Sequence, residues 1–134
     1  MAGDFGKLLD SIQESNDQLS LAHGRLGRAF EKLDGRLTRF NAKARIEPYE
    51  VDKKSGLKIG YRRFENRWSI STLVEGVAGL EAEVPVQETG PEMQAALMPH
   101  VEALLKKIAE SIKADVKVAE KAAAEADKIL AALP

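Results

Sequence analysis

Two histidines are the first residues that could do chemistry, because an imidazole can act as an acid, a base or a metal ligand near neutral pH. His23 falls within a repeating apolar pattern and His100 directly follows Pro99. Neither has a second histidine four residues away or a flanking pair of carboxylates, so we expect no metal site. We interpret His23 as a buried imidazole that sets helix register together with Asn16, with a pH-responsive core site as the alternative.

Motifs for nucleophilic or phosphate chemistry are missing from the sequence. It has no cysteine, which excludes disulfide scaffolds, Cys-ligated zinc and thiol chemistry. It also lacks a Gly-x-Ser-x-Gly elbow, a Walker-type loop and a dinucleotide-binding glycine motif. We therefore predict a chain that is not an enzyme, has no catalytic residues and needs no cofactor.

A basic block is the strongest candidate for function. Residues 24–68 contain 13 Lys and Arg against six acids, although the whole chain has a net charge of −1. Within it we single out Arg62, Arg63 and Arg67 with Trp68 as a partner-binding set, since cations beside aromatic rings can hold anionic groups and stack on unpaired bases. The partner we expect is an acidic protein, and the alternative is nucleic acid or another anionic polymer.

Acidic residues follow the basic block and could neutralise it within the fold. Residues 69–100 contain five acids and no Lys or Arg. If the segment from Glu75 to Glu92 covers the basic block, the binding hypothesis loses its main support. The sequence pI of about 6.2 also differs from that of a dedicated nucleic-acid binder.

The basic block begins inside a long heptad pattern, which predicts a helix over residues 4–45 with one apolar stripe. Gly24, Gly27 and Gly35 leave the phase of the pattern intact, so we expect the helix to bend there and not to end. We predict that this stripe is the seam of a homo-oligomer. Its residues are Phe5, Leu9, Ile12, Asn16, Leu19, His23, Leu26, Phe30, Leu33, Leu37 and Phe40.

Between residues 46 and 88 the period changes to two, which predicts an antiparallel meander of three or four strands. With Glu65 and Asn66 as the loop of a hairpin, Arg63 pairs with Trp68 and Tyr61 pairs with Ile70. Asn66 is expected to take the left-handed conformation of the turn. Pro85 would confine a fourth strand to an edge.

A second heptad helix is expected over residues 89–133, with a kink near residue 99 caused by Pro99. The fold class that we predict is α+β, with two long amphipathic helices flanking a central three- to four-stranded antiparallel meander in one domain over residues 1–134. The two helices would form an antiparallel hairpin with the sheet at its tip. A second copy would then cover the remaining stripes.

From these patterns we predict a self-associating assembly or adaptor module, most simply a dimer held together by a coiled coil. The alternatives are an anionic-polymer binder and, further off, an enzyme without a recognisable motif. The sequence shows neither a secretory leader nor an apolar run of the roughly 20 residues that span a bilayer. We therefore expect a cytoplasmic protein.

Overall fold

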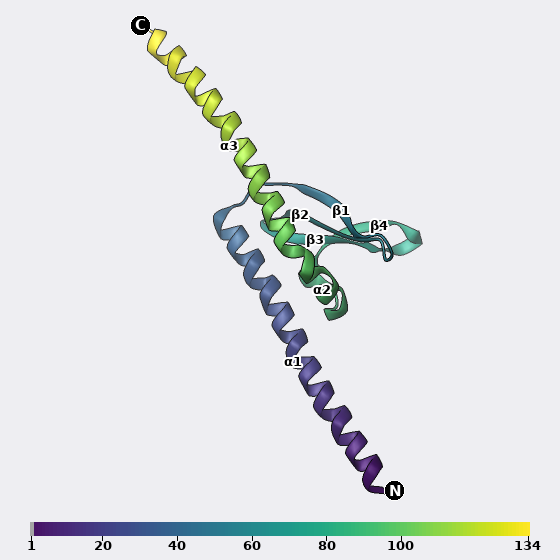
Figure 1. The fold of residues 1–134 in the computed structure, drawn as a ribbon. Coiled ribbons are helices and arrows are strands. Elements are labelled where there is room, and N and C mark those ends of the chain that lie inside the picture. Colours follow the sequence, from purple (N-terminus) through teal and green to yellow (C-terminus); the bar gives the residue numbers. More distant parts are fainter. Residues whose placement is uncertain (1) are drawn as a thin grey trace.

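The computed structural model describes residues 2–134, and it places a long helix, a four-stranded antiparallel sheet and a second long helix in that order (Figure 1). Short 3₁₀ turns connect several of these elements. The helices are α1 (Ala2–Phe40), α2 (Pro91–Leu97) and α3 (Val101–Ala132). The strands are β1 (Ile46–Asp52), β2 (Leu57–Phe64), β3 (Arg67–Glu75) and β4 (Glu81–Pro85). The 3₁₀ turns are η1 (Val77–Gly79), η2 (Val86–Glu88) and η3 (Met98–His100).

Helix α1 continues through its internal glycines and ends at Phe40, five residues earlier than the heptad pattern predicts. Asn41 ends it by taking a left-handed conformation with φ 51°. The N–H of Asn41 then donates to the carbonyl of Thr38, and that of Ala42 donates to the carbonyl of Leu37. Such a left-handed residue satisfies carbonyls that the last helical turn leaves free.

The strands form a meander in the order β1-β2-β3-β4, so β1 and β4 are the edges. In the β2–β3 hairpin Tyr61 pairs with Ile70 and Arg63 pairs with Trp68, which confirms the predicted register. The left-handed residue of the turn is Glu65, with φ 57°, and the prediction that it is Asn66 was wrong. The longer glutamate therefore adopts a conformation that non-glycine residues rarely take.

The core lies on one face of the sheet. Ile59 and Tyr61 of β2 and Ile70 of β3 are fully buried on this face. Phe30 of α1 and Leu104 of α3 belong to the same buried cluster. Both long helices therefore share one core.

The predicted arrangement, in which two long helices flank the sheet, is corrected by this core. A sheet flanked by helices would bury side chains of α1 and α3 against opposite faces, whereas both contribute to the single cluster on the Ile59 and Ile70 face. The other face has a solvent-open hollow lined by Arg62, Phe64 and Glu83. The physical reason is that β2 and β3 have only one strongly apolar face, and each helix has only one stripe with which to cover it.

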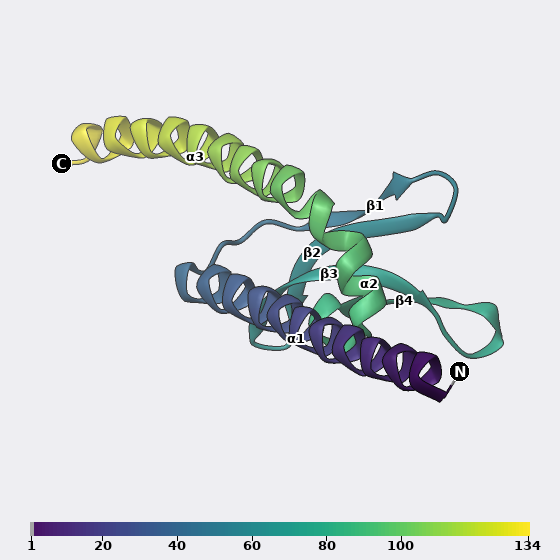
Figure 2. The ribbon, with the colours of Figure 1, turned by 60° about the horizontal axis from the view of Figure 1, so that its bottom comes forward.

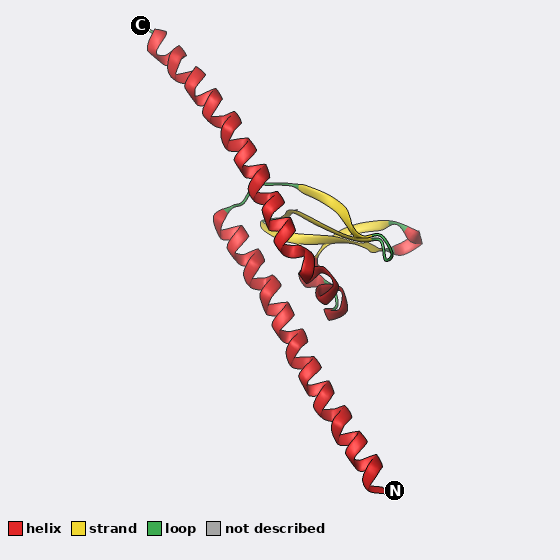
Figure 3. Cartoon of the chain, in the orientation of Figure 1, coloured by secondary structure: helices red, strands yellow, loops and turns green. Residues whose placement is uncertain are grey.

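The predicted antiparallel helical hairpin was also wrong. Figures 1 and 2 show α1 and α3 running in roughly the same direction, and the two ends of the chain lie at opposite ends of the molecule. The first part of α1 and the last part of α3 each extend beyond the sheet as a single helix (Figure 3). We call residues 3–22 the α1 overhang and residues 113–132 the α3 overhang, and every side chain in both is exposed.

The C-terminal helical region begins with Pro91 in the first turn of α2, where a missing N–H costs nothing. It is interrupted by the 3₁₀ turn η3, which contains Pro99, and resumes as α3 at Val101. Proline at this position removes a backbone donor and changes the course of the chain. The change of course lets α2 pack beside α1, while α3 contacts β2 and then extends away from the sheet (Figure 2).

Candidate functional site

Polar side chains of α1 fix this helix against β3. Strand β4 pairs with β3 only from Ser71 onward, which leaves the backbone of Trp68 without a partner strand on that side. The hydroxyl of Thr38 accepts from the Trp68 N–H at 3.0 Å and donates to the Trp68 carbonyl at 3.1 Å. The Trp68 indole N–H donates to Asn41 Oδ1 at 3.0 Å. Side chains of α1 therefore continue the hydrogen bonding where β4 stops.

Asp34 extends the same contact into the interior, and it is fully buried. Its carboxylate accepts from the backbone N–H of Ile70 at 3.0 Å, from the Ser69 hydroxyl at 2.5 Å and from the Gln87 amide at 2.5 Å. Burial raises the pKa of Asp34, and the hydrogen bonds from Ser69, Gln87 and Ile70 together with the charge of Arg67 oppose that rise. One carboxylate thus joins α1, β3 and η2.

This polar set was not among the residues that the sequence patterns predicted to be functional. Asp34 and Thr38 are four residues apart and share one side of α1, and Asn41 follows directly after the helix. That spacing is the available signal, but a polar stripe next to an apolar one usually faces solvent. These side chains find backbone groups to bind because β4 does not pair with β3 before Ser71, which leaves the edge of β3 open there.

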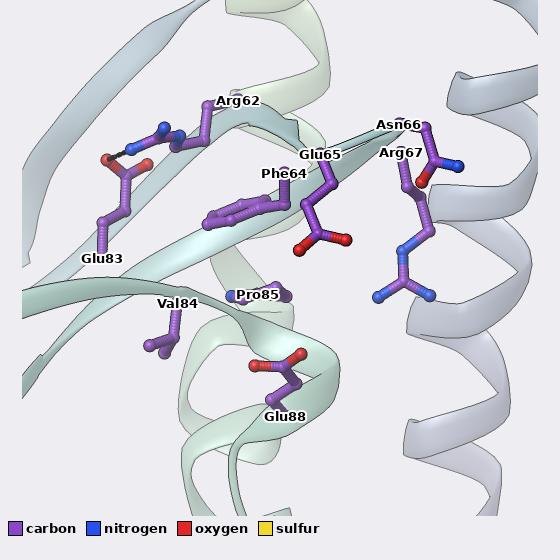
Figure 4. A pocket seen from close by; sticks show the side chains of 9 residues that line it. All are labelled: Arg62, Phe64, Glu65, Asn66, Arg67, Glu83, Val84, Pro85 and Glu88. Carbon is purple, nitrogen blue, oxygen red and sulfur yellow. Dashed lines mark ion pairs between the residues drawn. The ribbon is translucent and has the colours of Figure 1, made fainter.

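A hollow of about 490 Å³ opens on the face of the sheet that the helices leave uncovered (Figure 4). Arg62 lies over the ring of Phe64, with its guanidinium carbon 5.0 Å from the ring centre. Glu83 of β4 makes ion pairs with Arg62 at 3.7 Å and with Arg45 at 3.6 Å. Arginine and glutamate side chains line the hollow together, so it has no clear excess of positive charge.

The four residues predicted to bind a partner divide between two faces of the sheet. Arg62 and Arg67 both line the hollow, where Figure 4 shows them on either side of Phe64 and Glu65. Arg63 and Trp68 are paired across the hairpin and lie on the opposite face. Trp68 is half-buried and stacks on Tyr61, with the ring centres 5.4 Å apart. The hairpin therefore does not present all four side chains to one partner.

Basic residues of α1 and of the loop that follows it form a separate surface, which we call the basic ridge. Its side chains are exposed, and within residues 2–134 none of them makes an ion pair. The basic ridge consists of Arg25, Arg28, Lys32, Arg36, Arg39 and Lys43. In the acidic segment from Glu75 to Glu92, Glu83 therefore pairs with Arg45 and Arg62, and the basic ridge stays open.

The predicted oligomer seam changes character along α1. Its first part lies in the α1 overhang, where Phe5 is 70% and Ile12 is 63% exposed. His23 and Leu26 are half-buried at the point where α1 reaches the rest of the fold. Phe30 is fully buried in the chain's own core, while Leu33 and Leu37 pack against that core. The part of the seam that remains open therefore consists mainly of the overhang: Phe5, Leu9, Ile12, Asn16 and Leu19.

A second apolar surface runs along α3. A groove of about 690 Å³ lies between the end of α1 and α3, and its walls include Leu37, Phe40, Ile108 and Ile112. The groove continues to Val116 and Ala119 in the α3 overhang. Beyond these residues the stripe extends over Ala123, Ala126 and Leu130, all of which are exposed. Large apolar surfaces left open to water commonly mark interaction sites.

No group of three or more His, Asp or Glu side chains in residues 2–134 is placed to hold a metal ion. None of the helices in that range combines the length and the apolar character that crossing a membrane requires. Comparison with protein-family models, curated proteins and solved structures found no match.

Proposed function

We propose that this chain is a non-enzymatic assembly module that self-associates through the exposed apolar stripes of its overhangs. The observation that carries this proposal is the α1 overhang, a helical segment of roughly five to six turns that carries a heptad stripe and whose side chains are all exposed. An isolated helix of this length is marginal in water, because most helical stability in proteins comes from packing of the apolar face. A second helix against the stripe would supply that packing.

Paired substitutions in the α1 overhang test the proposal. We expect Ile12→Glu combined with Leu19→Glu to convert the protein to a monomer, because both replace exposed seam residues with charge. Ser11→Glu combined with Gln18→Glu adds the same charge to the same two turns, one residue away from the seam, and serves as the matched control.

Sedimentation velocity at matched concentrations distinguishes these variants. The proposal predicts that the control pair sediments like the unmodified protein and that the seam pair sediments more slowly. Equal sedimentation of all three proteins would rule out association through the α1 overhang.

A second candidate function is binding of an anionic polymer by the basic ridge, with an acidic protein as the related alternative. It is favoured by the six exposed cations of the basic ridge, none of which makes an ion pair within residues 2–134, whereas Arg62 of the hairpin pairs with Glu83. Affinity for single-stranded RNA should then fall steeply as salt increases.

Charge reversal on the basic ridge tests this second candidate. Lys32→Glu with Arg39→Glu should remove retention on single-stranded RNA at low salt. Lys106→Glu with Lys113→Glu makes the same change on exposed positions of α3 and should leave it intact. If the unmodified protein is not retained at all, binding to RNA is excluded.

A further inference from the structure

We infer that the α1 overhang of one copy packs antiparallel on the α3 overhang of a second copy, reciprocally, so that a two-fold dimer covers both stripes of both chains. This inference rests on the self-association proposed above and specifies its partner surface. Four features carry it: the direction of the overhangs, their side-chain sizes, their charge and the groove beside α3.

The direction of the overhangs permits a closed dimer. Helices α1 and α3 run in roughly the same direction, and their overhangs extend from opposite ends of the sheet (Figures 1 and 2). A two-fold axis perpendicular to the helices reverses the second copy, which brings each α1 overhang beside the partner's α3 overhang. Each overhang has 20 residues and is about 30 Å long, so neither stripe extends beyond the other. Such an isologous contact closes on itself.

The heptads of the two overhangs match in antiparallel order. When Ile12 faces Ala123 of the other copy, the same spacing places each seam residue of α1 opposite a seam residue of α3. The other facing pairs are Phe5 with Leu130, Leu9 with Ala126, Asn16 with Ala119 and Leu19 with Val116. In the three central pairs a larger side chain therefore faces alanine, which allows the helices to approach closely.

Charge favours α3 over a second α1 as the partner of the α1 overhang. Residues 1–23 carry four acids and one lysine, a net charge of −3, so pairing two α1 overhangs places −3 against −3. Residues 113–134 carry four lysines and four acids, a net charge of zero. Like charges side by side oppose association, whereas the neutral α3 overhang imposes no such penalty.

The groove beside α3 extends the proposed contact toward the sheet. It is lined by Leu37 of α1 and by Ile112 and Val116 of α3, and it opens directly onto the α3 stripe. In the antiparallel register Leu19 of the second copy lies opposite Val116, at the mouth of this groove. The dimer would therefore also cover this apolar groove next to the core.

Disulfide crosslinking tests the arrangement sharply, because the chain has no cysteine of its own. Ile12→Cys and Ala123→Cys are prepared as separate full-length variants, mixed and oxidised. The control mixture is Ser11→Cys with Ala124→Cys, which lie one residue away and outside the seam. We expect the first mixture to form a disulfide-linked dimer at least about tenfold faster than the control, since packing raises the effective concentration of the two thiols.

Oxidation of each single-cysteine variant by itself provides the second part of the test. In the proposed dimer the two copies of position 12 lie at opposite ends, so the Ile12→Cys variant alone should not crosslink. If the protein sediments as a dimer but Ile12→Cys links to itself, or the seam mixture shows no preference over the control mixture, the inference is overturned and self-association still stands. A monomer at every concentration overturns self-association itself.

The double variant, with Ile12→Cys and Ala123→Cys in one chain, tests closure of the dimer. Both seams of a two-fold dimer can then be linked at once, so oxidation should stop at a linked dimer. A ladder of larger species would contradict the closed two-fold arrangement.

Discussion

At the scale of single residues, Asp34 determines how α1 is held on the sheet. It is a fully buried carboxylate that accepts hydrogen bonds from β3 and η2. Buried polar groups stabilise a fold only while their partners remain satisfied, because each unmade hydrogen bond leaves a desolvated donor or acceptor behind. Removal of the Asp34 carboxylate would therefore leave three donors without this acceptor.

Replacing Asp34 with alanine tests this role. The Ile70 N–H and the Ser69 hydroxyl would lose their acceptor in the interior, and we expect a loss of about 2–4 kcal/mol in the free energy of unfolding. Urea denaturation followed by the fluorescence of Trp68, the one tryptophan in the chain, measures the change. A loss below about 0.5 kcal/mol, the size typical of surface substitutions, would contradict the role assigned to Asp34.

The pH dependence of stability provides an independent test of the same residue. Because burial raises the pKa of Asp34 in the folded state, the folded protein binds this proton more tightly than the unfolded chain does. The contribution of Asp34 to stability is therefore complete below its unfolded pKa and decreases as pH rises through the folded pKa. Asp34→Asn cannot titrate, so its stability relative to the unmodified protein should increase from about pH 4 to about pH 7. A difference that stays constant over this range would show that the pKa is not raised.

At Glu65 the backbone takes a left-handed conformation that a glutamate side chain disfavours. Its φ of 57° is one that glycine adopts freely. We expect Glu65→Gly to stabilise the protein by about 0.5–1 kcal/mol, because the strain of the side chain is removed. Asn66→Gly, next in the same turn, is the matched control and should give no such gain. If both glycine variants unfold at the same urea concentration as the unmodified protein, the turn is not strained at Glu65.

At the scale of elements, α1 combines two segments that differ in what stabilises them. Its last third is held by the core and by hydrogen bonds to β3, whereas every side chain of its overhang is exposed. Local stability follows such differences, since segments with few buried contacts open more readily.

Amide hydrogen exchange measures this division within α1. We expect the amides of residues 3–22 to be protected at high protein concentration and to lose protection on dilution, because the second copy dissociates. The amides of residues 30–40 should keep much of their protection at both concentrations. Protection of residues 3–22 that does not depend on concentration would show that the overhang is stable without a partner.

How much of these elements could be predicted from sequence depends on the range of the interaction. The hairpin register followed from alternation and a two-residue loop, both of which are local. Two features required tertiary information: the side of the sheet on which α3 packs, and the contacts of Asp34 with β3 and η2. A heptad pattern also cannot show which part of a stripe the chain itself covers, and here Phe30 is buried whereas Phe5 is exposed.

At the scale of the whole molecule, the net charge of −1 conceals surfaces of different character. Glu83 makes ion pairs with both Arg45 and Arg62, so part of the basic block that seemed free to bind a partner is engaged within the fold. The basic ridge stays open, and so do the two apolar overhangs. The overhangs extend furthest from the sheet, and the proposed dimer covers them with each other.

Sedimentation equilibrium of the unmodified protein tests the central claim of self-association most directly. One chain has a mass of 14.6 kDa. From about 1 µM to about 1 mM, mass action predicts that the average mass rises with concentration and levels off at twice the mass of one chain. A mass of one chain throughout that range would contradict the claim.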